Sequence, residues 1–563
     1  MSVRKRIRQL ESLCRVFAPG AAEQKIRLLD ELRGQQLRHA GLIASLRQSL
    51  AFITAFPDTV RHHRLAQTLS RDLDRQIDGD EELRLQLADT ATTGTELSYS
   101  YSYHAAAWLC RRYGGDIRID WDQLVEGHEF DELVGLAVSY PELDYFESGR
   151  VSSRDWLNQA KGACEITDIC WLMAQLRAAR GQEDLHARVY DTAEVPLRWR
   201  ISARASTMGN RFGGGEIVPR TGMRRPGADP AAEVAEPLKT LRRVDPAVGR
   251  RLLDIAMTTL ATRHRETYHF VHANPAEVYL ADVGQGVSIA VFGLLPRFRF
   301  VLDCTMGYLI LANGVPIGYG GSSAVFHQIN TGVNLLEEYR GSEAAFLWVQ
   351  VLRTYRQLFG CSHFIANPYQ VGHGNKEALK SGAYWFYHRL GFRSRDESAR
   401  KLAAREHDRM QKKAGYRSDL KTMKDLVQYD VHLQIAGASE DEFFKEAWLE
   451  ACSGGATEFI AAQTVANRRQ ALHSAASQVA ETLGIQDLNE WAPAERQGFV
   501  RMASIVGAIE DLPRWRRSEK SSLAALMKAK GGSFERDYIM RLRKHDRFRK
   551  ALVALADRIE RIA

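Results

Sequence analysis

Residues 265–435 contain a change of hydrophobic pattern that limits the possible folds of this chain more than any other feature. The first part holds three consecutive strand-like runs with turn signals between them, VYLADVGQGVSIAVFGLL, FRFVLDCTMGYLILANG and VPIGYGGSSAVFHQ. The Asn313-Gly314 pair between the second and third runs is typical of a tight turn in a β-hairpin. Residues 329–336 continue as strand, and helical spacing begins a few residues later.

Helices alternate with a strand in the second part of this region. In residues 344–359, apolar side chains recur on one helical face, at Leu347, Val351, Leu352, Tyr355, Leu358 and Phe359. The sequence HFIANPY predicts a short strand that ends at Pro368. Residues 375–390 predict a second helix, with Asn375 as its N-cap and Gly391 at its end. This order of elements predicts an α/β (α+β) fold in which helices pack on a mixed sheet.

The flanking regions predict helices, and the chain divides into four expected regions. They are a mostly helical N-terminal region (1–204), a Gly-, Pro- and Arg-rich linker or lid (205–245), the sheet-containing core (246–437) and a helical C-terminal region with a basic end (438–563). Within the first region, the alternation SYSYSY at 98–103 predicts an extended segment. The sequence RVYDTAEVPLRWRIS at 188–202 predicts a strand.

Charge and cysteine usage restrict the environment and the partners. The net charge is +8, but residues 512–563 hold 15 Lys and Arg against 6 Asp and Glu. Such an end can bind an anionic partner, or it can be the solvated face of a helix. The seven Cys show no CxxC pair and no metal-ligand spacing, which favours reduced thiols in a cytoplasmic protein and predicts no metal. No apolar stretch reaches the length of a membrane span.

The sequence VNLLEEYRGSEAAF at 333–346 predicts an apolar strand, a turn at Arg340-Gly341 and the start of a helix. A turn of this kind directs successive backbone N–H groups and the positive end of the helix dipole at one spot, which suits a pyrophosphate. Gly341 permits close approach of the backbone, and Ser342 can add a hydroxyl donor. No P-loop, dinucleotide fingerprint, GxSxG or HExxH motif is present.

The phrase EEYRGSEAA resembles the pyrophosphate-binding loop of the GNAT superfamily of N-acetyltransferases, and SGAYWFYHRLGF resembles the last conserved helix of that family. The matching positions are Arg340, Gly341 and Ala345 in the loop, and Ala383, Tyr387, Gly391 and Phe392 in the helix. Two positions depart from the pattern, because Glu343 replaces an expected Gly and Lys380 an expected Asn. The resemblance covers about residues 265–400.

The resemblance implies a GNAT-like mixed sheet whose two central strands splay apart around a thioester. It also implies that acetyl-CoA or another acyl-CoA is the co-substrate, and that an amine attacks the acyl group directly. The expected function is therefore that of an acyl-CoA-dependent N-acyltransferase. The residues expected to bind the cofactor are Leu335, Arg340, Gly341, Ser342, Ala344 and Ala345.

Direct attack requires a base for the ammonium, donors for the oxyanion and an acid for the leaving thiolate. By resemblance, Tyr387 is the acid. Two residues are candidates for the base: Glu337 at the end of the strand, and His327 near its start.

Two other hypotheses remain open at this point. Glu343 and Lys380 favour a GNAT-like binding or structural protein with a decayed site. The basic C-terminal end favours a helical scaffold that binds nucleic acid. For the enzyme, the expected partner is an amine-bearing acceptor, with a second copy of the chain or a carrier protein on the helical flanks, and neither nucleic acid nor a membrane.

Overall fold

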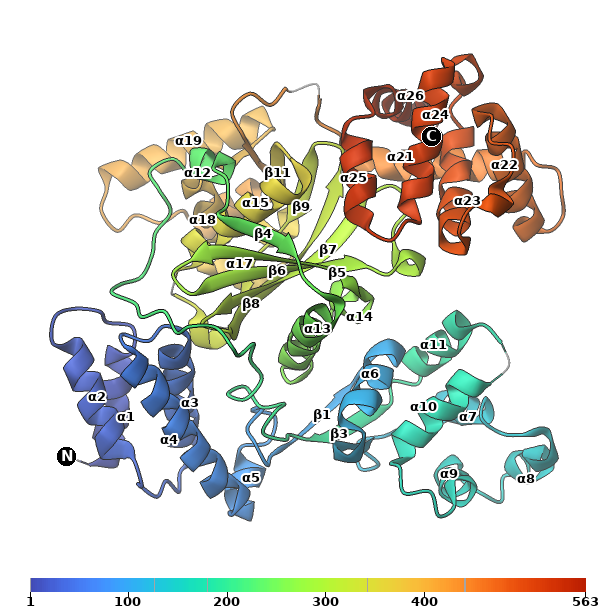
Figure 1. Cartoon of the computed structure of the whole chain (residues 1–563). Coiled ribbons are helices and arrows are strands. Elements are labelled where there is room, and N and C mark those ends of the chain that lie inside the picture. The colour runs from blue at the N-terminus through green and yellow to red at the C-terminus, as the bar shows by residue number, and fades with distance from the viewer. Residues whose placement is uncertain (1, 126, 180, 342, 440–441, 563) are drawn as a thin grey trace. The chain divides into compact units, whose positions relative to one another are not determined.

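The computed structural model of the chain describes residues 2–125, 127–179, 181–341, 343–439 and 442–562. The described chain forms two compact units. Unit 1 comprises residues 1–222, 251–272 and 312–316, and unit 2 comprises residues 223–250, 273–311 and 317–563. The boundary near residue 222 lies within the expected linker, and the C-terminal helices belong to the same unit as the large sheet (Figure 1).

Unit 1 begins with five helices: α1 (Val3–Leu13), α2 (Ala21–Leu32), α3 (Ala40–Ala55), α4 (Val60–Asp78) and α5 (Glu81–Gln86). A buried ion pair joins α2 to the start of α4, because Lys25 Nζ lies 2.8 Å from a carboxylate oxygen of Asp58. Lys25 is completely buried, so the pair fixes the helix packing at a cost in desolvation.

The rest of unit 1 packs helices around a three-stranded antiparallel sheet of order β1-β3-β2. The elements are β1 (Glu96–Ser100), α6 (Tyr103–Tyr113), β2 (Ile117–Ile119), α7 (His128–Gly135), α8 (Leu143–Glu147), α9 (Ser153–Lys161), α10 (Asp168–Ala178), α11 (Glu183–Thr192), β3 (Pro196–Arg200) and α14 (Tyr268–Val271). The extended segment expected at 98–103 is confirmed only through Ser100. The strand expected at 188–202 is wrong in its first half, because α11 continues to Thr192 with His186, Ala187 and Tyr190 on a buried helical face.

Unit 2 is built on a ten-stranded mixed sheet of order β12-β13-β11-β9-β8-β7-β6-β5-β4, with β10 also paired to β8. The strands are β4 (Thr240–Arg243), β5 (Ala273–Gly284), β6 (Val287–Leu294), β7 (Cys304–Ala312), β8 (Val315–Val325), β9 (Gln328–Thr331), β10 (Asn334–Leu335), β11 (His363–Ala366), β12 (Arg393–Ser394) and β13 (Val431–Gln434). The turn predicted between β7 and β8 is confirmed, since Asn313 (φ +46°) and Gly314 (φ +77°) both have the positive φ that a type I′ hairpin turn requires.

The helices between the strands are α15 (Ala344–Phe359), α16 (Pro368–Val371), α17 (Lys376–Ser381), α18 (Ala383–Arg389), α19 (Glu397–Lys412) and α20 (Leu420–Leu426). The helix predicted at 344–359 is confirmed, with its apolar face buried. The single helix predicted at 375–390 is wrong. Asn375 does cap its start by accepting a hydrogen bond from the N–H of Ala378, but Gly382, at φ +70°, divides the segment into α17 and α18.

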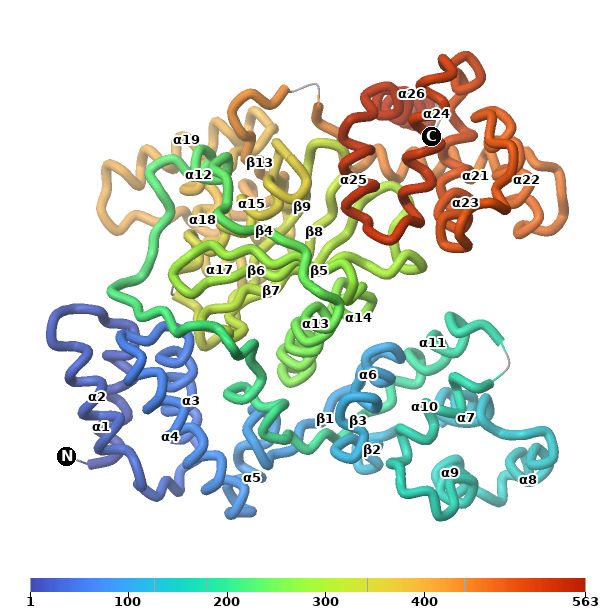
Figure 2. Tube along the Cα trace, viewed as in Figure 1, coloured from blue at the N-terminus to red at the C-terminus, as the bar shows by residue number. Residues whose placement is uncertain are grey.

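Residues 223–238, here called the strap, belong to the expected linker or lid (205–245) and pack along α15. Four side chains bond to the strap from positions that share one helical face: the N-cap residue Glu343, and Gln350, Arg353 and Gln357 of α15. The strap contains α12 (Pro230–Ala235) and leads through β4 into the edge of the sheet, as the green tube of Figure 2 shows. Helix α13 (Pro246–Ala261) follows it.

The C-terminal region forms a helical bundle of α21 (Ala447–Ala461), α22 (Arg468–Leu483), α23 (Pro493–Gly507), α24 (Arg517–Lys530), α25 (Glu535–Arg543) and α26 (Asp546–Ile562) (Figure 1). A buried ionic cluster joins this bundle to the sheet, and its members are Glu277, Arg299, Lys530 and Glu535. The basic end is therefore only partly a solvated face, because Lys530 and Arg549 are buried while Arg541 and Lys544 are exposed.

Candidate active site

The centre of the sheet contains an interrupted strand. β9 and β10 both pair with β8 in the same antiparallel register, and the two residues between them, Gly332 and Val333, are the interruption. β9 also pairs in parallel with β11, from Gln328 with His363 to Asn330 with Ile365. β11 then ends at Ala366 and turns into α16, while β10 stays on β8. The two parallel strands therefore diverge beside residues 332–333, here called the strand break.

Tyr308 of β7 reaches the strand break across β8, which lies between β7 and β9 in the sheet. Its hydroxyl donates a 2.5 Å hydrogen bond to the carbonyl oxygen of Gly332, and the side chain is completely buried. Gly320 of β8 makes this possible, since a Cβ at that position would lie 2.5 Å from the Tyr308 hydroxyl oxygen. Glycine in a central strand thus marks a close approach here.

Tyr387 of α18 reaches the strand break as well. Its side chain is 2% exposed and packs edge-on against Trp348 of α15, with ring centroids 6.0 Å apart. Burial raises the pKa of the Tyr387 phenol well above its ordinary value, and a hydrogen bond with the backbone of Val333 acts in the opposite direction. The phenol is therefore neutral and retains its proton across the physiological range.

Gln370 of α16 lies against Gly332. A Cβ built on Gly332 would lie 2.3 Å from the Cδ and Oε1 atoms of Gln370 and 2.7 Å from its Nε2. The absence of a side chain at residue 332 is what lets the amide approach the backbone so closely. One amide and two phenols therefore surround the strand break.

The expected pyrophosphate loop follows β10 and leads into α15. Leu335 pairs with Gly318 of β8, and Ala344 and Ala345 open α15. Gly341 has a φ of +77° with no atom within 4 Å of its Cβ position, so the backbone is accessible there. Ser342 lies outside the described residues.

Arg340 of this loop is half exposed and makes an ion pair of 2.7 Å with Glu377 of α17. This pair is on the surface, where such interactions contribute less than about 1 kcal/mol. An anionic ligand can therefore compete with Glu377 for the guanidinium.

Glu343, which departs from the family pattern, occupies the N-cap position of α15 but does not cap the helix with its side chain. Its carboxylate is buried and accepts a 2.6 Å hydrogen bond from the backbone N–H of Arg224 in the strap. The strap therefore binds the negatively charged carboxylate. The N–H groups in the first turn of α15 have no acceptor within the helix, so they can donate to a ligand.

The two base candidates lie at opposite ends of the segment that contains β9 and β10. Glu337 is exposed, in a 3-10 turn (Glu337–Tyr339) that follows β10. His327 precedes β9, at the end opposite the strand break, which at about 3.3 Å per residue is roughly 20 Å away along the strand. Its Nδ1 lies 3.6 Å from a carboxylate oxygen of Glu442, and burial lowers the pKa of the imidazole.

Sequence reasoning missed Tyr308, Gly332, Gln370 and Arg224. A signal for the approach of Tyr308 existed in Gly320, because a glycine within a strand-like run indicates close approach of another group. Gln370 and Arg224 had none, since their partners lie far away in the sequence.

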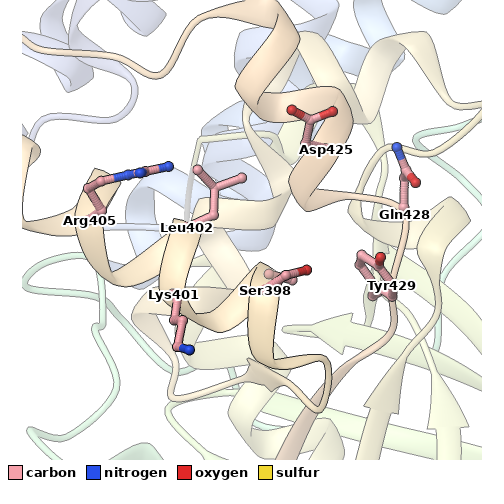
Figure 3. A pocket seen from close by; sticks show the side chains of 8 residues that line it. Ser398, Lys401, Leu402, Arg405, Asp425, Gln428 and Tyr429 are labelled. Carbon is pink, nitrogen blue, oxygen red and sulfur yellow. The ribbon is translucent and has the colours of Figure 1, made fainter.

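A separate hollow of about 560 Å³ lies between α19 and the segment that runs from the end of α20 to Tyr429 (Figure 3). Lys401 and Arg405 line it from α19, and Asp425, Gln428 and Tyr429 face them. Lys401 also pairs with Glu397 at 2.7 Å, so the lining is nearly balanced in charge. The lining includes none of the residues at the strand break.

Within the described ranges, no three His, Cys, Asp or Glu side chains are grouped so as to hold a metal ion. None of the described helices combines the length and the apolar character that crossing a membrane requires. Comparison with known proteins found no matching family model, no matching curated protein and no matching solved structure.

Proposed function

We propose that unit 2 is an acyl-CoA-dependent N-acyltransferase with a GNAT-like core. The observation that carries the proposal is the placement of the Tyr387 hydroxyl at the backbone of Val333, beside the point where β9 and β11 diverge. The family pattern expects a tyrosine of this helix beside a gap of this kind. The run of antiparallel strands followed by the parallel pair of β9 and β11, which is connected through α15, also supports the proposal.

In the proposed reaction the strand break receives the acyl end of the thioester, and the loop before α15 binds the pyrophosphate. Arg340, the Gly341 backbone and the N–H groups of Ala344 and Ala345 are the proposed phosphate donors, and Leu335 flanks the pantetheine arm. The nitrogen lone pair of the amine attacks the carbonyl carbon. When the C–S bond breaks, its electron pair goes to sulfur, which takes the proton of Tyr387. The amine nitrogen releases a proton, which restores the phenol by way of solvent.

The placement of Glu343 weakens the alternative of a decayed site. A free carboxylate in the loop would repel a pyrophosphate, but this one is buried and bonded to the strap. The pair between Arg340 and Glu377 still favours the alternative, because it occupies a proposed phosphate donor. The proposal thus includes both substrates: acyl-CoA as the acyl donor and an amine as the acceptor.

Thermal unfolding in the presence of acetyl-CoA tests the proposal. A ligand that binds only the folded state stabilises it by RT ln(1 + [L]/Kd), about 2.7 kcal/mol at 100 times Kd. Arg340→Glu should abolish the Tm shift, whereas Glu377→Gln should preserve or increase it, because it frees the guanidinium. If millimolar acetyl-CoA and longer acyl-CoAs leave the wild-type Tm unchanged, the enzyme proposal fails and the decayed-site alternative replaces it.

A further inference from the structure

Three polar side chains lie at the strand break: Tyr308, Tyr387 and Gln370. The amide of Gln370 differs from the two phenols because it is partly exposed and, in the described part of the chain, is not already hydrogen-bonded. Gln370 is half-buried, whereas Tyr308 and Tyr387 are almost completely buried and already bond to the backbone of residues 332–333. Among the described residues, the Gln370 side chain forms no hydrogen bond. It therefore has two N–H donors and one carbonyl acceptor to offer to a ligand.

The backbone holds this amide in place. Asn367 caps the short helix α16, and its Oδ1 accepts a 3.0 Å hydrogen bond from the N–H of Gln370. α16 follows directly from β11, so the position of Gln370 is fixed by the strand that diverges from β9. A donor that is positioned before the ligand arrives stabilises developing charge without a reorganisation cost.

The two sides of the strand break are chemically different. Tyr387 bonds at Val333 and comes from α18, while Gln370 lies against Gly332 and comes from α16. A thioester has two atoms that gain negative charge as an amine attacks, the carbonyl oxygen and later the sulfur. Tyr387 is the proposed proton donor for the sulfur, which leaves the carbonyl oxygen in need of a donor.

We propose that Gln370 is a catalytic residue, whose Nε2 donates a hydrogen bond to the acyl carbonyl oxygen as that oxygen becomes an oxyanion. This rests on the proposed function and adds a residue outside the family pattern. As the amine forms the N–C bond, the carbonyl π electrons move to the oxygen, where the Gln370 N–H stabilises them. When they return, the C–S bond breaks, and the thiolate takes the proton of Tyr387.

Measurements with three ligands distinguish an oxyanion donor from a residue that only helps to bind the cofactor. The ligands are CoA, S-ethyl-CoA and acetyl-CoA. Only acetyl-CoA carries the carbonyl oxygen that Gln370 would contact. Gln370→Leu should reduce kcat for acetyl-CoA hydrolysis, followed as released thiol, by about 10²–10³-fold, the usual effect of losing one oxyanion donor. Kd for CoA and for S-ethyl-CoA should stay within about twofold of wild type.

Gln370→Glu provides a second variant of nearly the same size, which tests the role if the leucine variant is unstable. An ionised carboxylate accepts but does not donate a hydrogen bond, so kcat should fall at least as far as in Gln370→Leu. Tyr369→Phe in the same turn is the matched control, because Tyr369 is 59% exposed, and its kcat should match wild type.

The outcomes distinguish this proposal from the one on which it rests. If wild type binds CoA and hydrolyses acetyl-CoA while both Gln370 variants retain full kcat, the role of Gln370 is refuted and the acyltransferase proposal stands. An equal loss of affinity for all three ligands would also refute it, since the side chain would then be a general contact. If wild type binds none of the three, both proposals fail together.

Discussion

The backbone N–H of Arg224 donates a 2.6 Å hydrogen bond to the carboxylate of Glu343, a residue 119 positions further along the chain. This bond ties the strap to the first turn of α15 and removes a negative charge from the face on which a phosphate would bind. In the proposed acyltransferase, the strap would thus hold the carboxylate that departs from the family pattern of the loop.

The bond between Glu343 and Arg224 predicts how the strap responds to mutation. Glu343→Ala should lower the free energy of unfolding by about 1.5–3 kcal/mol, because the Arg224 N–H loses a hydrogen bond to a charged acceptor. Tryptic cleavage after Arg224 and Arg225 should also accelerate. Urea denaturation and timed trypsin digestion measure the two effects. Glu236→Gln is the control, since its pair with Arg353 is 3.8 Å long and its carboxylate is 65% exposed.

Tyr387→Phe tests the proton donor. The ring and its packing against Trp348 remain, so the Tm should change by only a few degrees, while kcat for acetyl-CoA hydrolysis should fall by about 10²–10⁴-fold. Kd for CoA should change far less, because the hydroxyl acts mainly in the transition state. An unchanged kcat would leave Tyr387 as a packing residue. Because burial raises the pKa of the phenol, its ionisation should not limit the wild-type rate below pH 10.

Deletion of residues 512–563 should abolish cooperative folding of unit 2. The deleted segment contributes completely buried apolar side chains, among them Leu523, Leu526, Tyr538, Leu542 and Phe548. Each buried side chain of this size contributes about 1.5–3 kcal/mol, so their sum reaches the total stability of a typical domain. Near-UV circular dichroism and urea denaturation of the truncated chain provide the measurement.

A matched variant separates charge from packing in this region. Lys550→Ala removes a basic side chain that is 65% exposed and should change stability by less than about 1 kcal/mol. A truncated chain that unfolds cooperatively with a native near-UV spectrum would contradict the assignment of the C-terminal helices to the core.

Stability should fall in acid partly through His388. Burial is the main cause that lowers the pKa of this imidazole, and together with the charges of Arg393, His407 and Arg389 it brings the pKa to about 4. The folded state keeps His388 neutral, while the unfolded chain takes up a proton near its ordinary value of about 6.5. The free energy of unfolding should therefore decrease as pH falls from 6.5 to 4, by about 3 kcal/mol at most from this group.

His388→Gln should flatten that pH dependence whatever its effect on absolute stability. Urea denaturation at a series of pH values gives the slope for each variant. His128→Gln is the control, because the His128 side chain is 82% exposed. Equal slopes in wild type and His388→Gln would show that His388 binds protons equally in the folded and unfolded states, and would refute the lowered pKa.

Local patterns in the sequence were sufficient for the elements but not for the contacts between them. The helix at 344–359 and the cap at Asn375 depend on side chains within a few residues, and both are confirmed. The division at Gly382 was missed, because the apolar residues on either side of this glycine continue at helical spacing. The approach of Gln370 to Gly332 joins residues on different elements, so no local pattern indicates it.

The buried ionic cluster has a consequence for biosynthesis. The Glu277 carboxylate on β5 accepts the N–H of Arg536, which the ribosome adds 259 residues later. At about 5–20 residues per second, roughly 13–50 s of translation separate the two groups. During this interval the nascent sheet carries a carboxylate without its partner from α25, together with an apolar surface that the C-terminal helices have not yet covered. The last helices to leave the ribosome therefore determine when the central sheet can complete its folding.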